Sequence, residues 1–297
     1  MQTVLLTGAG GFTGRSLSNG LTGRGYKVIP LQFEVANPCD LTDAAATDSA
    51  IREARPDAVV HLAALSFVGH DNPEEFYRVN VFGTLNLLQA LARLDRPPRR
   101  ILIASSGNVY GTPDIEVLDE SICPAPVNHY ANSKLAMEHM VRSGWFNRLP
   151  IVIARPFNYT GPGQATRFVI PKIIQHFRDG ASFIELGNLN VFRDFSDVED
   201  VVTAYMALLE SDAHSEIVNI CSGQGIALLD VIRTMNHLAG YEIEVRVNPE
   251  FVRENEVPHL VGSNAKLHSL VKLPPPRPFA ETLKRMYEAP DESIKAV

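Results

Sequence analysis

Short apolar runs alternate with helix-length segments through the first two hundred residues, and this alternation constrains the fold more than any other feature. The runs are rich in Val, Ile and Leu without polar alternation, which is typical of strands buried on both faces of a sheet. The runs are Thr3–Leu6, Lys27–Leu31, Asp57–Leu62, Arg100–Ala104 and Ile151–Arg155, and the helical segments are Gly14–Arg24, Asp43–Arg55, Glu74–Leu94 and Asn132–Phe146. This repetition predicts an α/β fold with a doubly wound parallel sheet and right-handed crossovers.

The texture of the sequence changes after residue 157, where Gly and Pro cluster in 159–163 and the elements become shorter. We predict a dinucleotide-binding domain over 1–157 and a smaller α/β domain over 158–297. The run Glu216–Ile220 predicts a further strand, so we expect the chain to return to the first domain over 196–221. Helices are predicted at Ile170–Arg178, Leu228–Ala239 and Phe279–Tyr287.

Composition and charge narrow the function classes. Apolar residues make up 45% and charged residues 21% of the 297 residues, as in ordinary globular enzymes. The net charge is −7 and the basic block is the short 96–100, so we expect no nucleic-acid or membrane partner. No apolar run is long enough to span a bilayer, and the first residues do not resemble a signal peptide. Three scattered cysteines without a C-x-x-C predict reduced thiols, a cytoplasmic location and no structural metal.

A glycine-rich loop stands where the first predicted strand meets the first helix. Gly8, Gly11 and Gly14 follow a G-x-x-G-x-x-G spacing, with Phe12 and Thr13 between the last two. Glycines let the backbone turn tightly and approach a pyrophosphate, to which a helix N-terminus presents free N–H groups. The strand before the loop and the helix after it favour a dinucleotide site over a structural turn.

Other cofactor contacts are less determined by the pattern. Either Glu34, near the end of the second strand, or Arg15, in the first helix, is a candidate for reading the ribose, and NAD and NADP both remain open. Asp40, followed by Leu41, is either an adenine contact or the N-cap of the Thr42–Arg55 helix.

The end of the next strand is a further cofactor contact. Leu62, Ala63 and Ala64 would let the cofactor pass close to the backbone. His61, directly before them, is more typical of a structural histidine than of a catalyst.

Three polar residues form a reactive set. Tyr130 and Lys134 are four residues apart, so both side chains share one helix face. An ammonium group beside a phenol stabilises phenolate and lowers the tyrosine pKa, which suits proton transfer with a sugar hydroxyl. Ser106 follows the strand Arg100–Ala104, where it would face a ligand at the sheet edge.

These motifs resemble the extended short-chain dehydrogenase/reductase superfamily. The matching segments are 7–14, 61–64, 79–88, 105–111, 130–134, 155–158 and 193–200. The resemblance implies a Rossmann domain, NAD or NADP as cofactor, Ser106, Tyr130 and Lys134 as the catalytic trio, and a nucleotide-activated sugar as substrate. In similar enzymes the two long helices, 74–94 and 132–146, build a four-helix dimer interface, so we expect a homodimer.

Segments 155–164, 168–171, 193–198, 218–224 and 261–267 are more similar still to GDP-6-deoxy-4-keto-mannose reductases. The resemblance implies NAD(P)H-dependent reduction of the 4-keto group of GDP-4-keto-6-deoxy-mannose to GDP-rhamnose. A 4-epimerase acting on UDP-hexoses is the main alternative, because it uses the same trio. A 4,6-dehydratase is disfavoured, because Gly107 and Asn108 stand where dehydratases of the superfamily carry carboxylates. A non-catalytic NAD(P)-binding module is disfavoured by the complete trio.

The substrate diphosphate requires cations, and Arg193 is the first candidate because a guanidinium binds phosphate in a bidentate manner. Asn158 and Arg253 are further candidate contacts, and Glu256 is a candidate partner for the base or ribose. A solvated loop is an equal reading of Arg253 and Glu256. By resemblance, Phe168, Val169 and Lys172 lie near the nucleotide. Asn80 supports either the cofactor site or a bend in its helix.

Overall fold

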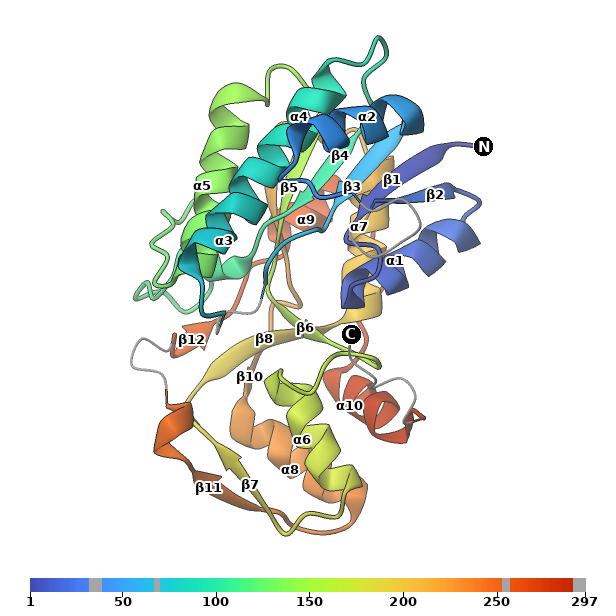
Figure 1. Cartoon of the computed structure of the whole chain (residues 1–297). Coiled ribbons are helices and arrows are strands. Elements are labelled where there is room, and N and C mark those ends of the chain that lie inside the picture. The colour runs from blue at the N-terminus through green and yellow to red at the C-terminus, as the bar shows by residue number, and fades with distance from the viewer. Residues whose placement is uncertain (32–38, 67–69, 253–256, 291–297) are drawn as a thin grey trace.

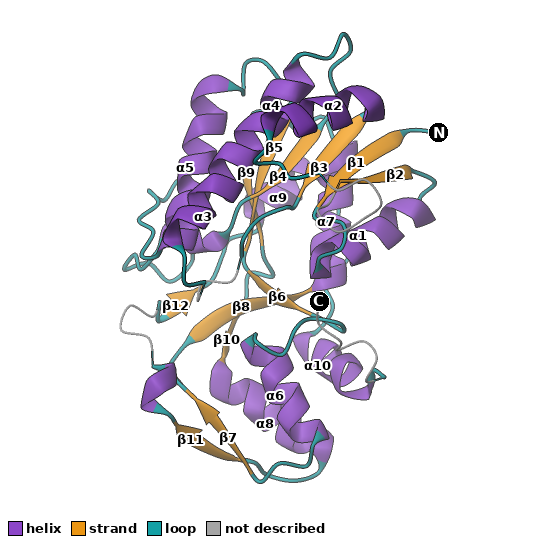
Figure 2. Ribbon diagram, in the orientation of Figure 1, coloured by secondary structure: helices purple, strands orange, loops and turns teal. Residues whose placement is uncertain are grey.

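The structure is a computed structural model that describes residues 1–31, 39–66, 70–252 and 257–290. Its centre is a six-stranded parallel sheet with the order β2-β1-β3-β4-β5-β9 (Figures 1 and 2). The strands are β1 (Thr3–Thr7), β2 (Lys27–Leu31), β3 (Ala58–His61), β4 (Ile101–Ala104), β5 (Ile151–Pro156) and β9 (Glu216–Ile220). The predicted α/β class with a parallel sheet is confirmed.

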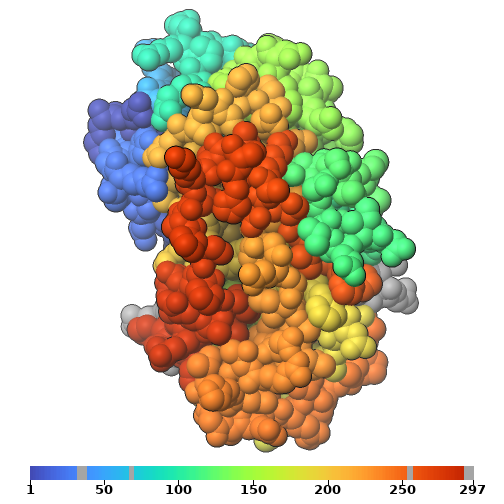
Figure 3. Space-filling view, turned by 180° about the vertical axis from the view of Figure 1, so that it is seen from behind, coloured from blue at the N-terminus to red at the C-terminus, as the bar shows by residue number. Residues whose placement is uncertain are grey.

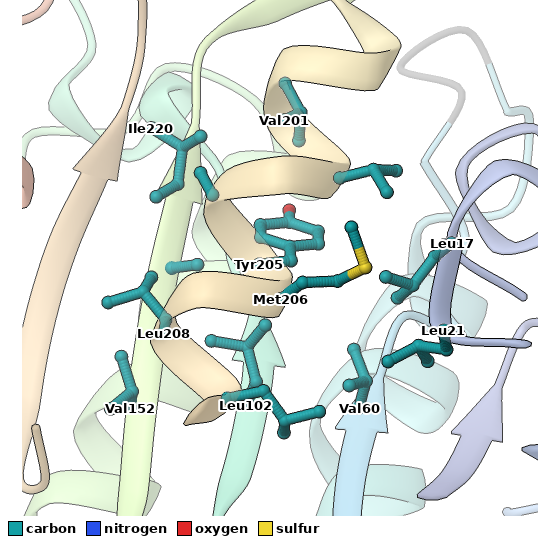
Figure 4. Close-up of a cluster of buried hydrophobic side chains, with 14 of the residues drawn as sticks. Leu17, Leu21, Val60, Leu102, Val152, Val201, Tyr205, Met206, Leu208 and Ile220 are labelled. Carbon is teal, nitrogen blue, oxygen red and sulfur yellow. The ribbon is translucent and has the colours of Figure 1, made fainter. Parts of the chain in front are cut away.

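Helices cover both faces of this sheet, which makes a three-layer sandwich (Figure 2). One face packs against α1 (Phe12–Gly23), α7 (Val198–Glu210) and α9 (Ala265–Leu270), and the other against α2 (Ala44–Ala54), α4 (Thr84–Ala92) and α5 (His129–Gly144). Successive strand residues point to opposite faces, so Val4 and Leu6 enter the first core while Leu5 enters the second. Figure 4 shows the first core, in which the Met206 side chain of α7 points toward Leu17 of α1.

The smaller part of the molecule lies beyond one edge of this sandwich (Figure 1). It contains a sheet of β6 (Asn158–Thr160), β8 (Phe192–Asp197), β10 (Gly225–Ala227) and β12 (His259–Leu260), and a pair of β7 (Phe183–Leu186) and β11 (Glu244–Val247). Helices α6 (Val169–Arg178), α8 (Leu228–Ala239) and α10 (Phe279–Glu288) pack on them around a separate core. Seen from behind, the orange-red C-terminal segments run down the surface across both parts (Figure 3).

Salt bridges attach the last helix to the rest. The buried Asp197 carboxylate, which begins α7, accepts from Thr282 at 2.8 Å and pairs with Arg277 and Arg285 at 2.9 and 3.1 Å. The strand β9 and the helix before it lie with the first part, on the segment for which a chain return is expected. The domain boundary at residue 157 stays a prediction. Within the described ranges, no helix is both long and apolar enough to cross a bilayer.

Two helix predictions are wrong in detail. The segment 74–94 is not one regular helix but α3 (Pro73–Tyr77), a π-helical turn η1 (Arg78–Gly83) and α4. Helix α5 begins at His129 rather than Asn132, because the Asn128 side chain caps it by accepting from Ala131 N at 2.9 Å. The earlier start places Tyr130 in the first helical turn. The short elements η2 (Gly107–Tyr110) and η3 (Pro249–Phe251) are 3₁₀ turns.

Candidate active site

The glycine loop, the end of β3, the end of β4 and the first turns of α5 meet at the carboxyl-terminal edge of the sheet. Ligands of open parallel sheets bind at this edge, where the chain leaves successive strands. The edge faces the smaller part of the molecule, since Thr13 Oγ1 lies 2.7 Å from the Tyr159 hydroxyl of β6.

The glycine loop has the shape that a pyrophosphate requires. Gly8 has φ +70°, and a Cβ there would lie 2.9 Å from Ala63 N; a Cβ at Gly14 would overlap the Gly8 carbonyl oxygen. Gly11 is the N-cap of α1, with no side-chain cap and no acidic residue in the first turn. The N–H groups at the start of α1 are therefore not satisfied by a cap, and the residues present fit a dinucleotide phosphate.

Side chains beside the loop hold it to the smaller part. The Phe12 ring stacks on Tyr159 with centroids 6.1 Å apart, and Thr13 bonds the same tyrosine. Arg15 donates to Gly10 O at 2.7 Å and to Gly163 O at 3.1 Å, so its guanidinium bridges the two parts of the molecule. Glu34, the other candidate for reading the ribose, lies outside the described residues.

His61 is a structural residue. Thr84 donates to Asn80 O, so its hydroxyl accepts from His61 Nε2 at 2.8 Å; Thr7 therefore donates to Nδ1 at 2.7 Å. With both nitrogens occupied, burial lowers the pKa of His61 to about 3, and the ring is neutral. The Thr7 hydroxyl also accepts from the backbone N–H groups of Leu62 and Ala63, which fixes the predicted cofactor segment 62–64 beside the glycine loop.

Asn80 fixes the same segment from the other side. Its buried amide accepts from Leu65 N at 2.9 Å and donates to Leu65 O at 3.1 Å and to Ser133 Oγ at 2.9 Å. Asn80 lies in the π-helical turn η1, and its bonds tie α5 to the loop after β3.

Asp40 is not the N-cap of α2. The cap is Asp43, whose carboxylate accepts from Ala45 N and Ala46 N, while exposed Asp40 accepts from Thr42 N at 2.8 Å. Asp40 closes the turn before the helix, so the capping interpretation of it was wrong by three residues. Leu41 is buried, and its carbonyl accepts from Asn86 at 2.8 Å.

The structure brings Ser106, Tyr130 and Lys134 together, and all three are buried. Lys134 Nζ donates to Ala104 O at 2.8 Å, two residues before Ser106. Burial raises the pKa of Tyr130 to about 12, and the Ser106 side chain partly opposes this. Burial also lowers the pKa of Lys134 to about 8, and Glu138 partly opposes this.

The expected lowering of the Tyr130 pKa by Lys134 is not observed. Desolvation of the buried phenol is the largest effect on the Tyr130 pKa, and the Lys134 ammonium donates a hydrogen bond to the Ala104 carbonyl. Tyr130 is thus held as a neutral phenol, the form that donates a proton.

A buried ion pair behind the trio was missed in the sequence. Glu138 pairs with Arg155 and accepts from Ser105 at 2.5 Å. The spacing of four residues between Lys134 and Glu138 was the available signal, because it places both on one face of α5.

The predicted substrate contacts are spread over the smaller part. Arg193 on β8 donates to Phe192 O at 2.9 Å and Pro258 O at 3.3 Å, and Asn158 Oδ1 is buried without a partner among the described residues. Lys172 donates to Glu185 O at 2.8 Å, and its ammonium lies 4.3 Å from the centroid of the Phe251 ring.

Two other predicted contacts stand at the start of α6, and two cannot be placed. Phe168 is the N-cap and Val169 the exposed first residue of that helix. Arg253 and Glu256 lie outside the described residues. In the described part of the chain, no group of His, Cys, Asp and Glu side chains could hold a metal ion.

A cavity of about 540 Å³ lies at the opposite edge of the sheet, around the chain before β1 and β4. It contains much of the basic block 96–100, and its arginines are Arg52, Arg55, Arg93, Arg96 and Arg99. Three of them lie at the C-terminal ends of α2 and α4, where cations offset the helix dipoles, so we do not assign a ligand to this cavity.

The comparisons with known proteins agree with this geometry. The model of the NAD dependent epimerase/dehydratase family matches residues 4–221. GDP-6-deoxy-D-talose 4-dehydrogenase from Aggregatibacter actinomycetemcomitans is 36% identical over 265 residues, 89% of each chain. GDP-6-deoxy-D-mannose reductase from Pseudomonas aeruginosa is 34% identical over 301 aligned positions, 95% of each chain.

Solved structures give the same result. RMD from Pseudomonas aeruginosa, complexed with NADPH, has a TM-score of 0.85 at 33% identity, over 97% of this chain and 96% of the other. A protein from Burkholderia cenocepacia J2315 has a TM-score of 0.91 at 45% identity over 99% of both chains. With this match over most of its length, the chain belongs to the NAD dependent epimerase/dehydratase family and is an NAD(P)-dependent enzyme.

Proposed function

We propose that this enzyme reduces the 4-keto group of GDP-4-keto-6-deoxy-mannose with NADH or NADPH and forms GDP-rhamnose. The observation that carries the proposal is the burial of Ser106, Tyr130 and Lys134 at the carboxyl edge of the sheet, where Lys134 bonds Ala104 O and Tyr130 is a neutral phenol. The two curated relatives that act on GDP-linked 6-deoxy sugars, at 36% and 34% identity, support the nucleotide and the sugar.

Each member of the trio has one role in this reaction. Bound NADH or NADPH would supply the hydride for the carbonyl carbon, and the ketone oxygen would then gain negative charge. Tyr130, the neutral acid, protonates that oxygen, and Ser106 donates a hydrogen bond to it. Lys134 anchors the nicotinamide ribose. Because its pKa is raised, Tyr130 carries its proton at neutral pH and is available as the acid of the reductive direction.

The configuration of the product at C4 separates two versions of this function. The products 6-deoxy-talose and 6-deoxy-mannose differ only at C4, so the names of the two relatives describe delivery of hydrogen to opposite faces of one ketone. The sugar's orientation over the nicotinamide decides between them. We propose the manno product and keep the talo product as the second candidate.

The other reactions of the family have less support. Neither Gly107 nor Asn108 has the carboxylate that a dehydratase needs. Gly107 lies against the Phe157 ring, and Asn108 donates its backbone N–H to Ser106 Oγ at 3.2 Å. A 4-epimerase remains chemically feasible with this trio, and a UDP-glucose 4-epimerase from Halalkalibacterium halodurans is 27% identical.

For the substrate we propose contacts in the smaller part of the molecule. Asn158 has a buried amide oxygen without a partner among the described residues, and Arg193 lies on the neighbouring strand β8. Both are proposed to bind the diphosphate, with Phe168, Val169 and Lys172 beside the nucleotide, and Arg253 and Glu256 as further contacts.

The decisive experiment is reduction of GDP-4-keto-6-deoxy-mannose by the purified protein with NADH or NADPH, followed by nicotinamide absorbance. We expect stoichiometric oxidation of one of the two cofactors. The Tyr130→Phe variant should lose about 10²–10⁴-fold in turnover, as expected for loss of a general acid. In the product, a large H3–H4 coupling in the proton spectrum indicates the manno configuration and a small one the talo configuration.

Tyr205→Phe is the matched control, because Tyr205 is also buried and its hydroxyl bonds no other described residue. It should retain full activity. No oxidation with either cofactor would overturn the assignment of GDP-4-keto-6-deoxy-mannose as substrate, and UDP-hexoses would then be tested for epimer formation without net cofactor change.

A further inference from the structure

Successive turns of α5 face the end of β4. The Ser106 side chain acts on Tyr130 by lowering its pKa against burial, and Lys134 Nζ donates to Ala104 O at 2.8 Å. Ser105 Oγ donates to Glu138 Oε1 at 2.5 Å. Positions i, i+4 and i+8 share one helix face, so the helix and the strand end are joined in a single register.

Glu138 is itself held from a third element. Arg155 on β5 donates through Nε to Glu138 Oε1 at 2.9 Å and through Nη2 to Oε2 at 2.6 Å. The guanidinium lies 4.8 Å from the centroid of the Tyr110 ring, whose hydroxyl donates to Asn219 at 2.7 Å. Glu138 is 1% and Arg155 2% exposed. Apolar residues of similar volume often stabilise a core as well as a buried ion pair does. Stability alone therefore does not explain the Glu138–Arg155 pair, whose geometry and charge need a separate account.

We propose that Glu138 is a positioning residue: through Ser105 and Arg155 it sets the register of α5 on the end of β4, which places Ser106 and Lys134, and its carboxylate, one helix turn from Lys134, offsets the ammonium charge. The effect on turnover rests on the proposed function. The effect on Lys134 does not, because the protonation state of that lysine is a property of the protein alone.

The charges around Lys134 agree in sign with this role. Burial lowers the Lys134 pKa to about 8, and the attraction of Glu138 on the same helix raises it. Arg155 on β5 is neutralised by Glu138, and His61 on β3 is an uncharged ring with a pKa of about 3. Removing the Glu138 charge removes the attraction that opposes burial of Lys134 and leaves the Arg155 guanidinium unpaired, so the lysine should lose its proton at lower pH.

The test is the titration of Lys134 in the protein without cofactor or substrate, followed by NMR of ¹³Cε-labelled lysine and assigned with Lys134→Met. We expect the midpoint of Glu138→Gln to fall by about one pH unit or more relative to wild type. Ser105→Ala keeps both charges and removes only the bond to β4, so its midpoint should stay near that of wild type. The double variant Glu138→Gln/Arg155→Met removes both charges, and its Lys134 midpoint should lie between those of wild type and Glu138→Gln.

The double variant also keeps the test decisive if Glu138→Gln does not fold, because it leaves no unpaired buried charge. An unchanged Lys134 midpoint in both variants would overturn the electrostatic part of the proposal. Turnover tests the geometric part: Ser105→Ala should lower kcat with little change in KM, and unchanged kcat would overturn it. If no keto sugar is reduced by the wild type, the NMR titration still decides the role of Glu138.

Discussion

At the residue scale, neighbours decide what a side chain does. His61 ends a strand beside the cofactor edge, yet Thr7 and Thr84 occupy both ring nitrogens and make it structural. Tyr130 is the reverse case: its role is predictable from the spacing to Lys134, but its pKa is not, because burial outweighs the lysine. Spacing identifies candidates, whereas desolvation and hydrogen-bond partners determine their protonation.

His61 makes a pH-dependent contribution to stability. Its folded pKa, about 3, lies below the usual 6.5, so stability is fully present above pH 6.5 and is lost as pH falls towards 3. The loss is about 1.4 kcal/mol per pH unit in this window. Between pH 6.5 and 4.5, urea unfolding should show a loss about 2–3 kcal/mol larger for wild type than for His61→Gln. The exposed His214→Gln should behave as wild type; equal losses in all three proteins would contradict the prediction.

At the scale of elements, the helix predicted over 74–94 is divided by the π-helical turn η1, and the irregularity has a use. It places Asn80 where its amide reaches Leu65 in the loop after β3 and Ser133 in α5. The π-helical turn leaves no clear signal in the apolar periodicity of the sequence, because one extra residue in a turn changes the phase of the pattern only locally. Helix existence was therefore predictable and its break was not.

Asn80→Ala tests the use of the π-helical turn. The variant leaves the N–H and C=O of Leu65 without their side-chain partner, at about 1–3 kcal/mol for each group that stays unsatisfied. We expect a fall of about 2–4 kcal/mol in the free energy of unfolding, together with weaker NAD(P)H binding measured by nicotinamide fluorescence. Asn236→Ala on α8 loses a single bond from Ile243 N and should cost about 1 kcal/mol without affecting NAD(P)H. Similar cofactor affinity in the two variants would refute the link to the site.

At the scale of the whole molecule, two parts meet at the carboxyl edge of the large sheet, where hydrogen bonds and the stack of Phe12 on Tyr159 join them. Arg15 and Thr13 reach Gly163 and Tyr159, while Arg277 and Arg285 hold α10 to Asp197. The outer surface of the helix layer presents the exposed ring of Phe82 on η1. We keep the homodimer through 74–94 and 132–146 as a proposal.

Phe82→Glu tests that proposal. Phe82 is 57% exposed, and a carboxylate in an apolar helix interface should dissociate the dimer, with a clear shift to monomer mass in sedimentation equilibrium. Phe183→Glu on β7, 40% exposed and far along the chain, is the control and should leave the mass unchanged. A monomeric wild type would end the dimer proposal, and an unchanged Phe82→Glu dimer would move the interface elsewhere.

The sequence by itself determined the parallel sheet, the glycine loop and the placement of Tyr130 and Lys134 on one helix face. Each of these depends on local spacing: apolar runs, a strand–loop–helix passage and one helix turn. Only the tertiary structure decided the short strands β6, β8, β10 and β12, the pairing of Glu138 with Arg155 and the contact of Thr13 with Tyr159. Thr13 and Tyr159 are 146 positions apart, and such contacts arise when the layers pack. The protonation of Tyr130 and Lys134 belongs to the same class, because burial is a property of the assembled core.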